Sequence, residues 1–283
     1  MSLVAARIGC SALGLALCLV LSCGGQRIRL GDGIGDGGAA TAAGGRTGSH
    51  GGAGGSSAHG GTGKIPASGG GAGGDGASGG ESCSRGQVSA DEVLWIGDSW
   101  IIDPGSQRTT VKDLAFAAGT IAANEEYPSS AAAGASMAMI AQQYETRAGG
   151  TPKLKVLLMD GGTWDPIAAE LTGSSVAAAI DQSIADFQQF LSKVAIDGTV
   201  EHIVYFLVPE LMNIPGVAEM RPRLTQACAN SSVPCHFIDL QEVWKQGDPA
   251  TYTASNDILP SADGGVAIGQ AVWATMQAHC IAQ

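Results

Sequence analysis

Short apolar runs alternate with stretches of helical periodicity along residues 81–283. Runs rich in Val, Ile, Leu and aromatic residues predict five buried strands, at 92–96, 127–133, 155–159, 202–208 and 236–239. Apolar residues that recur every three or four positions predict helices at 109–118, 137–147, 174–195, 221–229 and 261–278. Strands that alternate with helices form a parallel sheet covered on both faces, so we expect one α/β domain here.

The first 22 residues follow a different pattern, in which Arg7 precedes an apolar run from Ile8 to Leu21. The run is shorter than the ~20 apolar residues that cross a bilayer, and it fits the apolar region of a secretory signal. Residues 20–23, VLSC, resemble the bacterial lipobox, whose cysteine becomes the lipidated first residue. We therefore expect residues 1–22 to be a lipoprotein signal peptide and Cys23 to carry lipid. Ordinary signal cleavage nearby is the alternative.

Residues 23–80 have the composition of a tether. Of the 43 glycines in the chain, 25 lie in residues 24–80, and such a segment buries too little apolar surface to offset its chain entropy. As a flexible coil it would span about 40 Å. We expect a disordered tether that holds the domain at 81–283 clear of a membrane. The predicted location is extracytoplasmic, lipid-anchored to the bacterial cell envelope at the outer membrane or cell surface.

The charge of the chain limits its partners. The formal net charge is −11, and residues 81–283 contain 10 Lys and Arg against 23 Asp and Glu. Nucleic-acid binding needs a basic face for phosphate contacts, so we expect no nucleic-acid partner. The lipid anchor is the only membrane contact that the sequence predicts. We also expect no cofactor.

Four cysteines remain after signal removal and lipidation, which are Cys83, Cys228, Cys235 and Cys280. An even number in an exported domain indicates disulfides, and three pairings are possible. We favour Cys228–Cys235 across a short loop and Cys83–Cys280 between the two ends of the domain. The alternative is a metal site that uses Cys228, Cys235 and His236. Their spacing is not that of a zinc knuckle, so we expect no metal.

The first predicted strand ends directly in Gly97-Asp98-Ser99. In parallel sheets, ligands bind beyond the carboxyl ends of the strands, and Gly134 and Gly162 follow the next two predicted strands. A serine there lies where backbone N–H groups can hold an oxyanion. The layout resembles the SGNH/GDSL hydrolases over about residues 91–280. The resemblance implies a flavodoxin-like three-layer α/β/α sandwich with a five-stranded parallel sheet, and esterase or acyl-hydrolase activity.

The resemblance assigns roles block by block. Ser99 is the candidate nucleophile, and Gly134, in Ala133-Gly134-Ala135-Ser136, is the candidate oxyanion donor. In Gly162-Thr163-Trp164-Asp165, Trp164 stands where the family has Asn. In the last block, residues 256–261, Asn256 takes the position of the family's Asp and Leu259 that of its His. Three of the five groups that the family relies on are therefore changed.

These changes remove the predicted proton acceptor. A serine hydroxyl is a poor nucleophile without an adjacent base, and Leu259 cannot accept a proton. His50 and His59 lie in the tether, and the other three histidines, His202, His236 and His279, are expected far from Ser99 with structural or surface roles. Asp257 is the nearest titratable alternative. It would need a raised pKa and hydrogen-bond reach to Ser99.

Aromatic residues beside the predicted site suggest ligand binding. The resemblance places Trp164 in the same cleft as Ser99, and we predict that Trp100, Trp164 and Asp165 contact a sugar ring or an apolar group. Alternatively, Trp164 fills the emptied catalytic pocket and packs on Leu259. Residues 209–216 are predicted to be either a loop over the cleft or a plain connector.

Two functional hypotheses follow. The first is a surface-anchored protein with a hydrolase fold that is catalytically impaired and binds a glycan or acyl-ester ligand in the old cleft. The second is an active serine esterase that uses a non-standard base. A purely structural role in the envelope stays open as a third.

Overall fold

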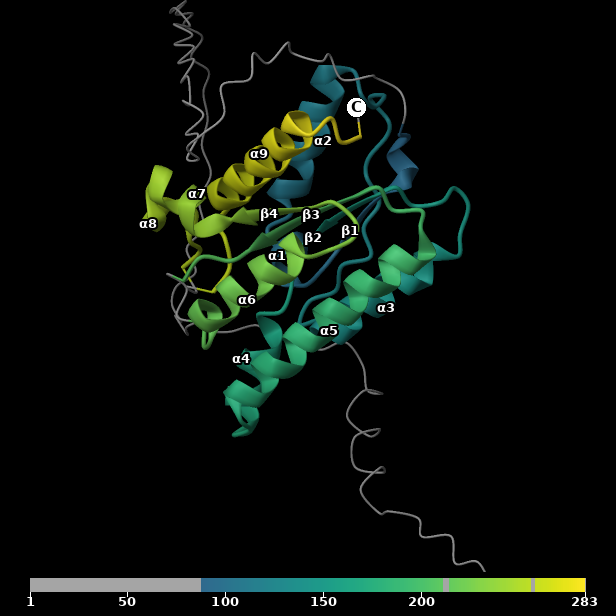
Figure 1. Cartoon of the computed structure of the whole chain (residues 1–283). Helices are drawn as coiled ribbons and strands as arrows, with labels where there is room; N and C mark the ends of the chain where they lie inside the picture. Colours follow the sequence, from purple (N-terminus) through teal and green to yellow (C-terminus); the bar gives the residue numbers. More distant parts are fainter. Residues whose placement is uncertain (1–87, 211–213, 256–257, 283) are drawn as a thin grey trace, which may run out of the picture. The chain divides into compact units, whose positions relative to one another are not determined.

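The computed structural model describes residues 88–210, 214–255 and 258–282. The predicted signal peptide, Cys23, the tether, Cys83, Asn256 and Asp257 lie outside the described residues. Four parallel strands form one sheet in the order β1-β2-β3-β4 (Figure 1). The strands are β1 (Val93–Ile96), β2 (Val156–Met159), β3 (His202–Leu207) and β4 (Cys235–Asp239). Each is short and mostly apolar, as strands buried on both faces are.

The fifth strand, predicted at 127–133, is not formed as a strand. This segment joins the sheet through one isolated parallel bridge between Ser129 and Trp95. Trp95 donates its N–H to the carbonyl of Pro128 at 2.9 Å and accepts one from Ser130 at 2.8 Å. Pro128 has no N–H to continue a ladder, which limits the pairing. The segment nevertheless lies beside β1 on the side away from β2, so the spatial order corresponds to the flavodoxin-like 2-1-3-4-5.

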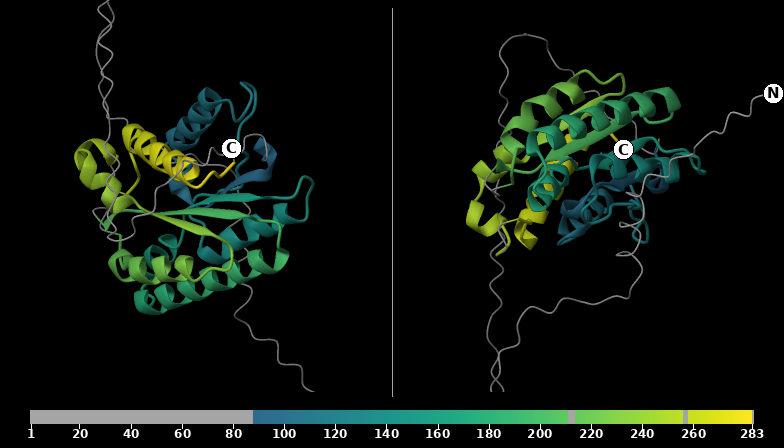
Figure 2. Two further views of the ribbon diagram at one scale, coloured as in Figure 1. Left: turned by 45° about the horizontal axis from the view of Figure 1, so that its top comes forward. Right: turned by 90° about the horizontal axis from the view of Figure 1, so that it is seen from below.

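Helices cover both faces of the sheet and make three layers (Figures 1 and 2). One face carries α2 (Ser106–Ala118) and α9 (Ala262–Ala278), and the other carries α3 (Met137–Ala148), α5 (Val176–Asp197) and α6 (Val217–Ala229). Side chains of a strand alternate between the faces. Val93 and Trp95 belong to the core under α9, while Leu94 and Ile96 belong to the core over α5.

The predicted helices are confirmed to within a few residues at their ends, and several short helices were missed. The missed helices are α1 (Ser99–Ile102), α4 (Trp164–Thr172), α7 (Leu240–Gln246) and α8 (Pro249–Tyr252). Each begins at or soon after the end of a strand or another helix, where the apolar pattern is too short to show a period. None of the helices in the described part of the chain is both long and apolar enough to cross a membrane.

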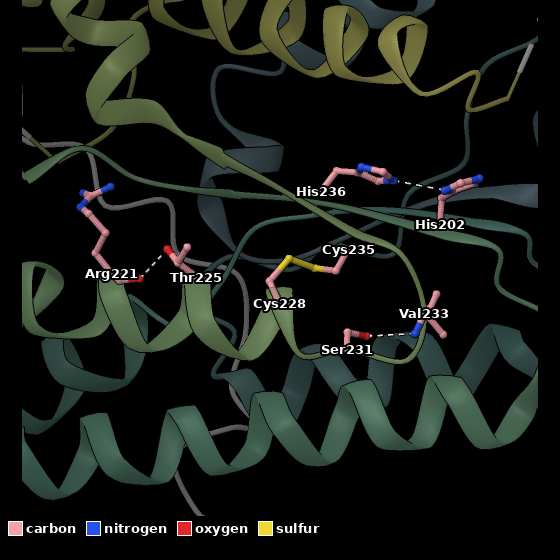
Figure 3. The surroundings of a disulfide bond; sticks show 8 residues. All are labelled: His202, Arg221, Thr225, Cys228, Ser231, Val233, Cys235 and His236. Atoms are coloured by element: carbon pink, nitrogen blue, oxygen red, sulfur yellow. Dashed lines mark hydrogen bonds between the residues drawn. A yellow bond between two sulfur atoms is a disulfide. The ribbon is translucent and has the colours of Figure 1, made fainter. Parts of the chain in front are cut away.

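A close backbone approach and a disulfide hold the helices in place. A side chain at Gly269 of α9 would lie 2.6 Å from the Gln107 carbonyl oxygen of α2, so glycine allows the two backbones this approach. The predicted disulfide between Cys228 and Cys235 is present and joins the end of α6 to the start of β4 (Figure 3). Cys280 is also disulfide-bonded. Its predicted partner, Cys83, lies outside the described residues.

Candidate active site

The turn after β1 brings its backbone against the end of β2. Gly97 has a φ of +152°, and a Cβ there would lie 1.7 Å from Oδ1 of Asp160. The side-chain amide of Gln143, on α3, binds both backbone groups of Gly97. The Gly97 N–H donates to Gln143 Oε1 at 2.7 Å, and Gln143 Nε2 donates to the Gly97 carbonyl at 2.9 Å. Only glycine fits this position, and the turn that carries Ser99 is fixed as a result.

Two buried acids lie directly under the turn. Asp160 Oδ1 accepts the N–H of Asp98 at 2.7 Å, while Asp98 accepts the N–H of Trp100 at 3.0 Å and the hydroxyl of Thr163 at 3.3 Å. Burial raises the pKa of Asp160 well above its usual range, and the negative charge of Asp98 raises that pKa further. Both effects disfavour the charged form of the Asp160 carboxyl group.

Ser99 is the first residue of α1 and is partly exposed at a pocket of about 350 Å³. The other polar side chains that line the pocket are those of Asp98, Thr163 and Glu170. Among the described residues, no hydrogen bond joins the Ser99 hydroxyl to another group, and no histidine lines the pocket. The hydroxyl is thus accessible, but no described imidazole activates it.

The three described histidines lie at the other edge of the sheet. His202 begins β3, His236 is the second residue of β4, and His279 follows the end of α9. The strands run from this edge toward Ser99, so the full length of β3 separates the imidazoles from the pocket. This agrees with their predicted distance from Ser99.

Most of the pocket wall is apolar. Its apolar lining residues are Trp100, Trp164, Ile167, Leu171, Ile214, Pro215 and Ile258. Leu171 is 75% exposed and Ile258 is 51% exposed, so both form an apolar rim at the mouth. Ile214 and Pro215 come from the segment predicted at 209–216 as a loop over the cleft. Their position in the wall favours that interpretation over a plain connector.

Trp164 covers the candidate oxyanion donor. Gly134 has a φ of +69°, and a Cβ there would lie 3.3 Å from Cε2 of Trp164. Within the described residues, the Gly134 N–H makes no backbone hydrogen bond. The structure therefore brings Gly134 and Trp164 together at the carboxyl edge, with an indole where the resemblance implies an amide.

Two predicted ligand contacts have other partners. Trp100 is only 2% exposed, and its Nε1 donates to the carbonyl of Ile258 at 3.1 Å. Asp165 accepts the N–H of Met137 at 3.0 Å at the start of α3 and is not among the pocket-lining residues. Burial raises the pKa of Asp165. Trp100 thus supports the pocket floor, while Asp165 stabilises the first turn of a helix.

The last block differs in detail from the expectation. Ile258 lines the pocket, whereas Leu259 packs against the apolar core on the α9 face. The segment is held by a backbone hydrogen bond from Ala254 to Leu259 and an isolated bridge between Thr253 and Pro260. Asp257, the alternative base, lies outside the described residues and stays a prediction.

Sequence reasoning missed Asp160, Thr163, Glu170 and Ile258. Asp160 carried a usable signal, because an acid directly after a buried strand lies at the same edge as Gly97-Asp98-Ser99. Glu170 and Ile258 carried none, since a helix and a turn that were not predicted position them.

Comparison with known proteins gives a fold and no closer relationship. No protein-family model matches the chain, and no curated protein matches its sequence. The acetyl xylan esterase AlAXEase is 12% identical with a TM-score of 0.53, and the match covers 64% of this chain and 98% of that one.

Two further solved structures agree. An alpha/beta hydrolase enzyme from the metagenome of Lake Arreo, Spain, is 15% identical with a TM-score of 0.51, over 68% of this chain and 97% of that one. A carbohydrate esterase family 3 protein from Talaromyces cellulolyticus is 10% identical with a TM-score of 0.51, over 66% and 97%. The domain has an SGNH hydrolase-like α/β fold.

Proposed function

We propose that this domain binds an apolar acyl-ester ligand at the carboxyl edge of its sheet and hydrolyses it poorly. The single observation that carries the proposal is the surroundings of Ser99. Its hydroxyl opens into a pocket in which the described residues supply carboxyl groups and apolar side chains but no imidazole.

The carboxyl groups near Ser99 are poor substitutes for a base. Asp98 already accepts hydrogen bonds from Trp100 and Thr163, and Asp160 is buried beneath the turn, accepts the Asp98 N–H and does not line the pocket. Glu170 is exposed to solvent, and no hydrogen bond joins its carboxyl group to Ser99. Loss of the base in serine hydrolases costs about a millionfold in turnover, roughly 8 kcal/mol of barrier.

The lining of the pocket favours an acyl or aryl group over a sugar. A glycan needs several polar partners for its hydroxyl groups, whereas seven of the eleven lining residues are apolar. Leu171 and Ile258 add exposed apolar surface at the mouth, where a chain would leave the pocket. Trp164 would contact the ligand through its ring.

The cellular setting is part of the same proposal. A signal peptide over residues 1–22, lipid on Cys23 and a tether to residue 80 would place the domain outside the cytoplasm, within reach of envelope lipids. An apolar pocket suits such surroundings, since acyl esters are abundant in lipid layers.

The test combines turnover and binding on the full chain. We expect no hydrolysis of a short-chain p-nitrophenyl ester above that of Ser99→Ala. We expect quenching of tryptophan fluorescence by a medium-chain acyl ester, with no response to xylo-oligosaccharide. Trp164→Phe should remove the quenching and is the control for signal from the other tryptophans. Turnover that disappears in Ser99→Ala would contradict the impaired state and establish an active esterase.

The active alternative is supported by the accessible Ser99 hydroxyl and the unbonded Gly134 N–H. If the chain is inactive, two matched double variants test whether it lacks only the catalytic Asp and His. These repairs are Asn256→Asp with Ile258→His, and Asn256→Asp with Leu259→His. Because Ile258 lines the pocket and Leu259 packs on the core, we expect any gain in the first only. A gain in neither repair is the result expected if Trp164, which lies over Gly134, also blocks the reaction.

A further inference from the structure

A second group of chemistry-bearing side chains lies at the amino edge of the sheet, away from the pocket. His202 and His236 project from neighbouring strands toward each other, on the opposite face of the sheet from the Cys228–Cys235 disulfide (Figure 3). The register pairs Val204 with His236, and side chains two apart share a face, so both imidazoles lie on the α9 side. His279, just after α9, places its ring 4.0 Å from that of His236, measured between centroids.

The spacing of the two facing nitrogens is the central observation. His202 Nδ1 and His236 Nε2 are 3.2 Å apart. Two imidazole nitrogens bound to one tetrahedral Zn²⁺ at ~2.0–2.1 Å would lie about 3.3 Å apart. The distance also fits a hydrogen bond with one proton between the rings. A cation can take the place of that proton after a modest rotation of the rings, whose terminal torsions are soft.

We propose that His202 and His236 chelate one borderline divalent cation, of the class of Cu²⁺ and Zn²⁺, with His279 beside them as a further imidazole. Neutral imidazole suits these ions, whereas Mg²⁺ and Ca²⁺ prefer oxygen ligands. The sulfurs of Cys228 and Cys235 lie on the other face of the sheet and are joined as a disulfide, so they are not thiolate ligands of this site.

The site is a partial one and is open to solvent. As the side chains stand, no three His, Cys, Asp or Glu residues of the described part converge on one point as ligands. His202 and His236 are partly buried and His279 is exposed, so water can complete the shell or His279 can turn inward. An open shell predicts that Cu²⁺ binds more tightly than Zn²⁺, following the usual order for nitrogen sites.

The test uses the tag-free full chain with His50→Asn and His59→Asn, which removes the tether imidazoles. Titration with CuCl₂ and ZnCl₂ by calorimetry should show one site, with Cu²⁺ tighter. His202→Asn and His236→Asn should each weaken binding by about tenfold or more. His279→Asn should have a smaller effect, and Mg²⁺ should not compete.

Paramagnetic resonance keeps the proposal testable if a variant fails to fold. The Cu²⁺ spectrum of the His50→Asn, His59→Asn protein should show coupling to at least two nitrogens, and it should change when histidine is labelled with ¹⁵N. No Cu²⁺ binding, or binding that is equal in the folded His202→Asn, His236→Asn double variant, would overturn the proposal. The outcome is independent of Ser99 and of any esterase activity.

Discussion

The two edges of the sheet contain different sets of chemistry-bearing side chains. The carboxyl edge has a hydroxyl, two buried acids and an apolar pocket, while the amino edge has three imidazoles. The six residues of β3 separate them by roughly 20 Å. A general base must lie within about 3 Å of the proton that it removes. A hydroxyl and an imidazole in one domain can therefore act together only where the fold brings them to the same edge of the sheet.

The same contrast appears in the titration of the two edges. Burial raises the pKa of Asp160 and lowers that of His236. In both cases burial disfavours the charged form. The two edges should therefore lose stability in opposite pH directions, which makes them separable in solution.

Gly97→Ala should have the largest effect, on the carboxyl edge. The new Cβ would lie 1.7 Å from Oδ1 of Asp160, and φ is +152°, so we expect a loss of about 3 kcal/mol in the free energy of unfolding. Urea denaturation measures it. Gly149→Ala is the matched control, because no atom lies within 4 Å of its added Cβ. Equal stability of the two variants would mean that the turn is not held against β2.

Asp160→Asn should change the pH dependence of stability. A carboxyl group whose folded pKa is raised stabilises most below its unfolded pKa, and this contribution is lost as pH rises through the folded value. The variant should therefore unfold with a flatter pH profile above pH ~4 than the parent chain. Urea denaturation across that range is the measurement, and an unchanged profile would show that Asp160 is ionised throughout.

His236→Gln should change the profile on the acidic side. The folded pKa is lowered from 6.5 to about 4, so stability from the neutral ring is present above pH ~6.5 and is lost as pH falls toward 4. We expect the parent to lose roughly 1–2 kcal/mol over this interval because of His236, after allowance for its partial exposure. The variant should lose less. His279→Gln is the comparison: it removes a charge that lowers the pKa of His236 but leaves the burial that lowers it most, so its profile should change less.

Leu171→Asp should have the smallest effect and sharpen the choice of ligand. Leu171 is exposed at the mouth of the pocket, so the change should leave folding intact. It should weaken the binding of a medium-chain acyl ester by roughly fivefold, about 1 kcal/mol. Fluorescence titration gives the dissociation constant. Ile196→Asp is the control, since Ile196 is 82% exposed on α5 and does not line the pocket. If both variants bind the ester equally weakly, the acyl chain of the ligand does not leave the pocket past Leu171.

Local patterns in the sequence were sufficient for the architecture. Apolar runs and helical periods predicted four of the observed strands and the longer helices, because burial on a parallel sheet requires continuous apolar strands. The prediction of a strand at 127–133 was wrong. It rested on the apolar residues of the segment and did not allow for Pro128, which has no N–H to continue the hydrogen-bond ladder. The Cys228–Cys235 disulfide followed from the short loop between a helix and a strand.

The site itself depended on contacts between distant segments. By itself, the sequence determined that a serine follows β1 and that no histidine stands near the last block. Only the tertiary structure decided that Trp164 covers Gly134, that Ile258 and not Leu259 lines the pocket, and that His202, His236 and His279 meet. The physical reason is that strand and helix periods fix which face a residue occupies, whereas the direction of a side chain in a turn is set by whatever packs against it from elsewhere in the chain.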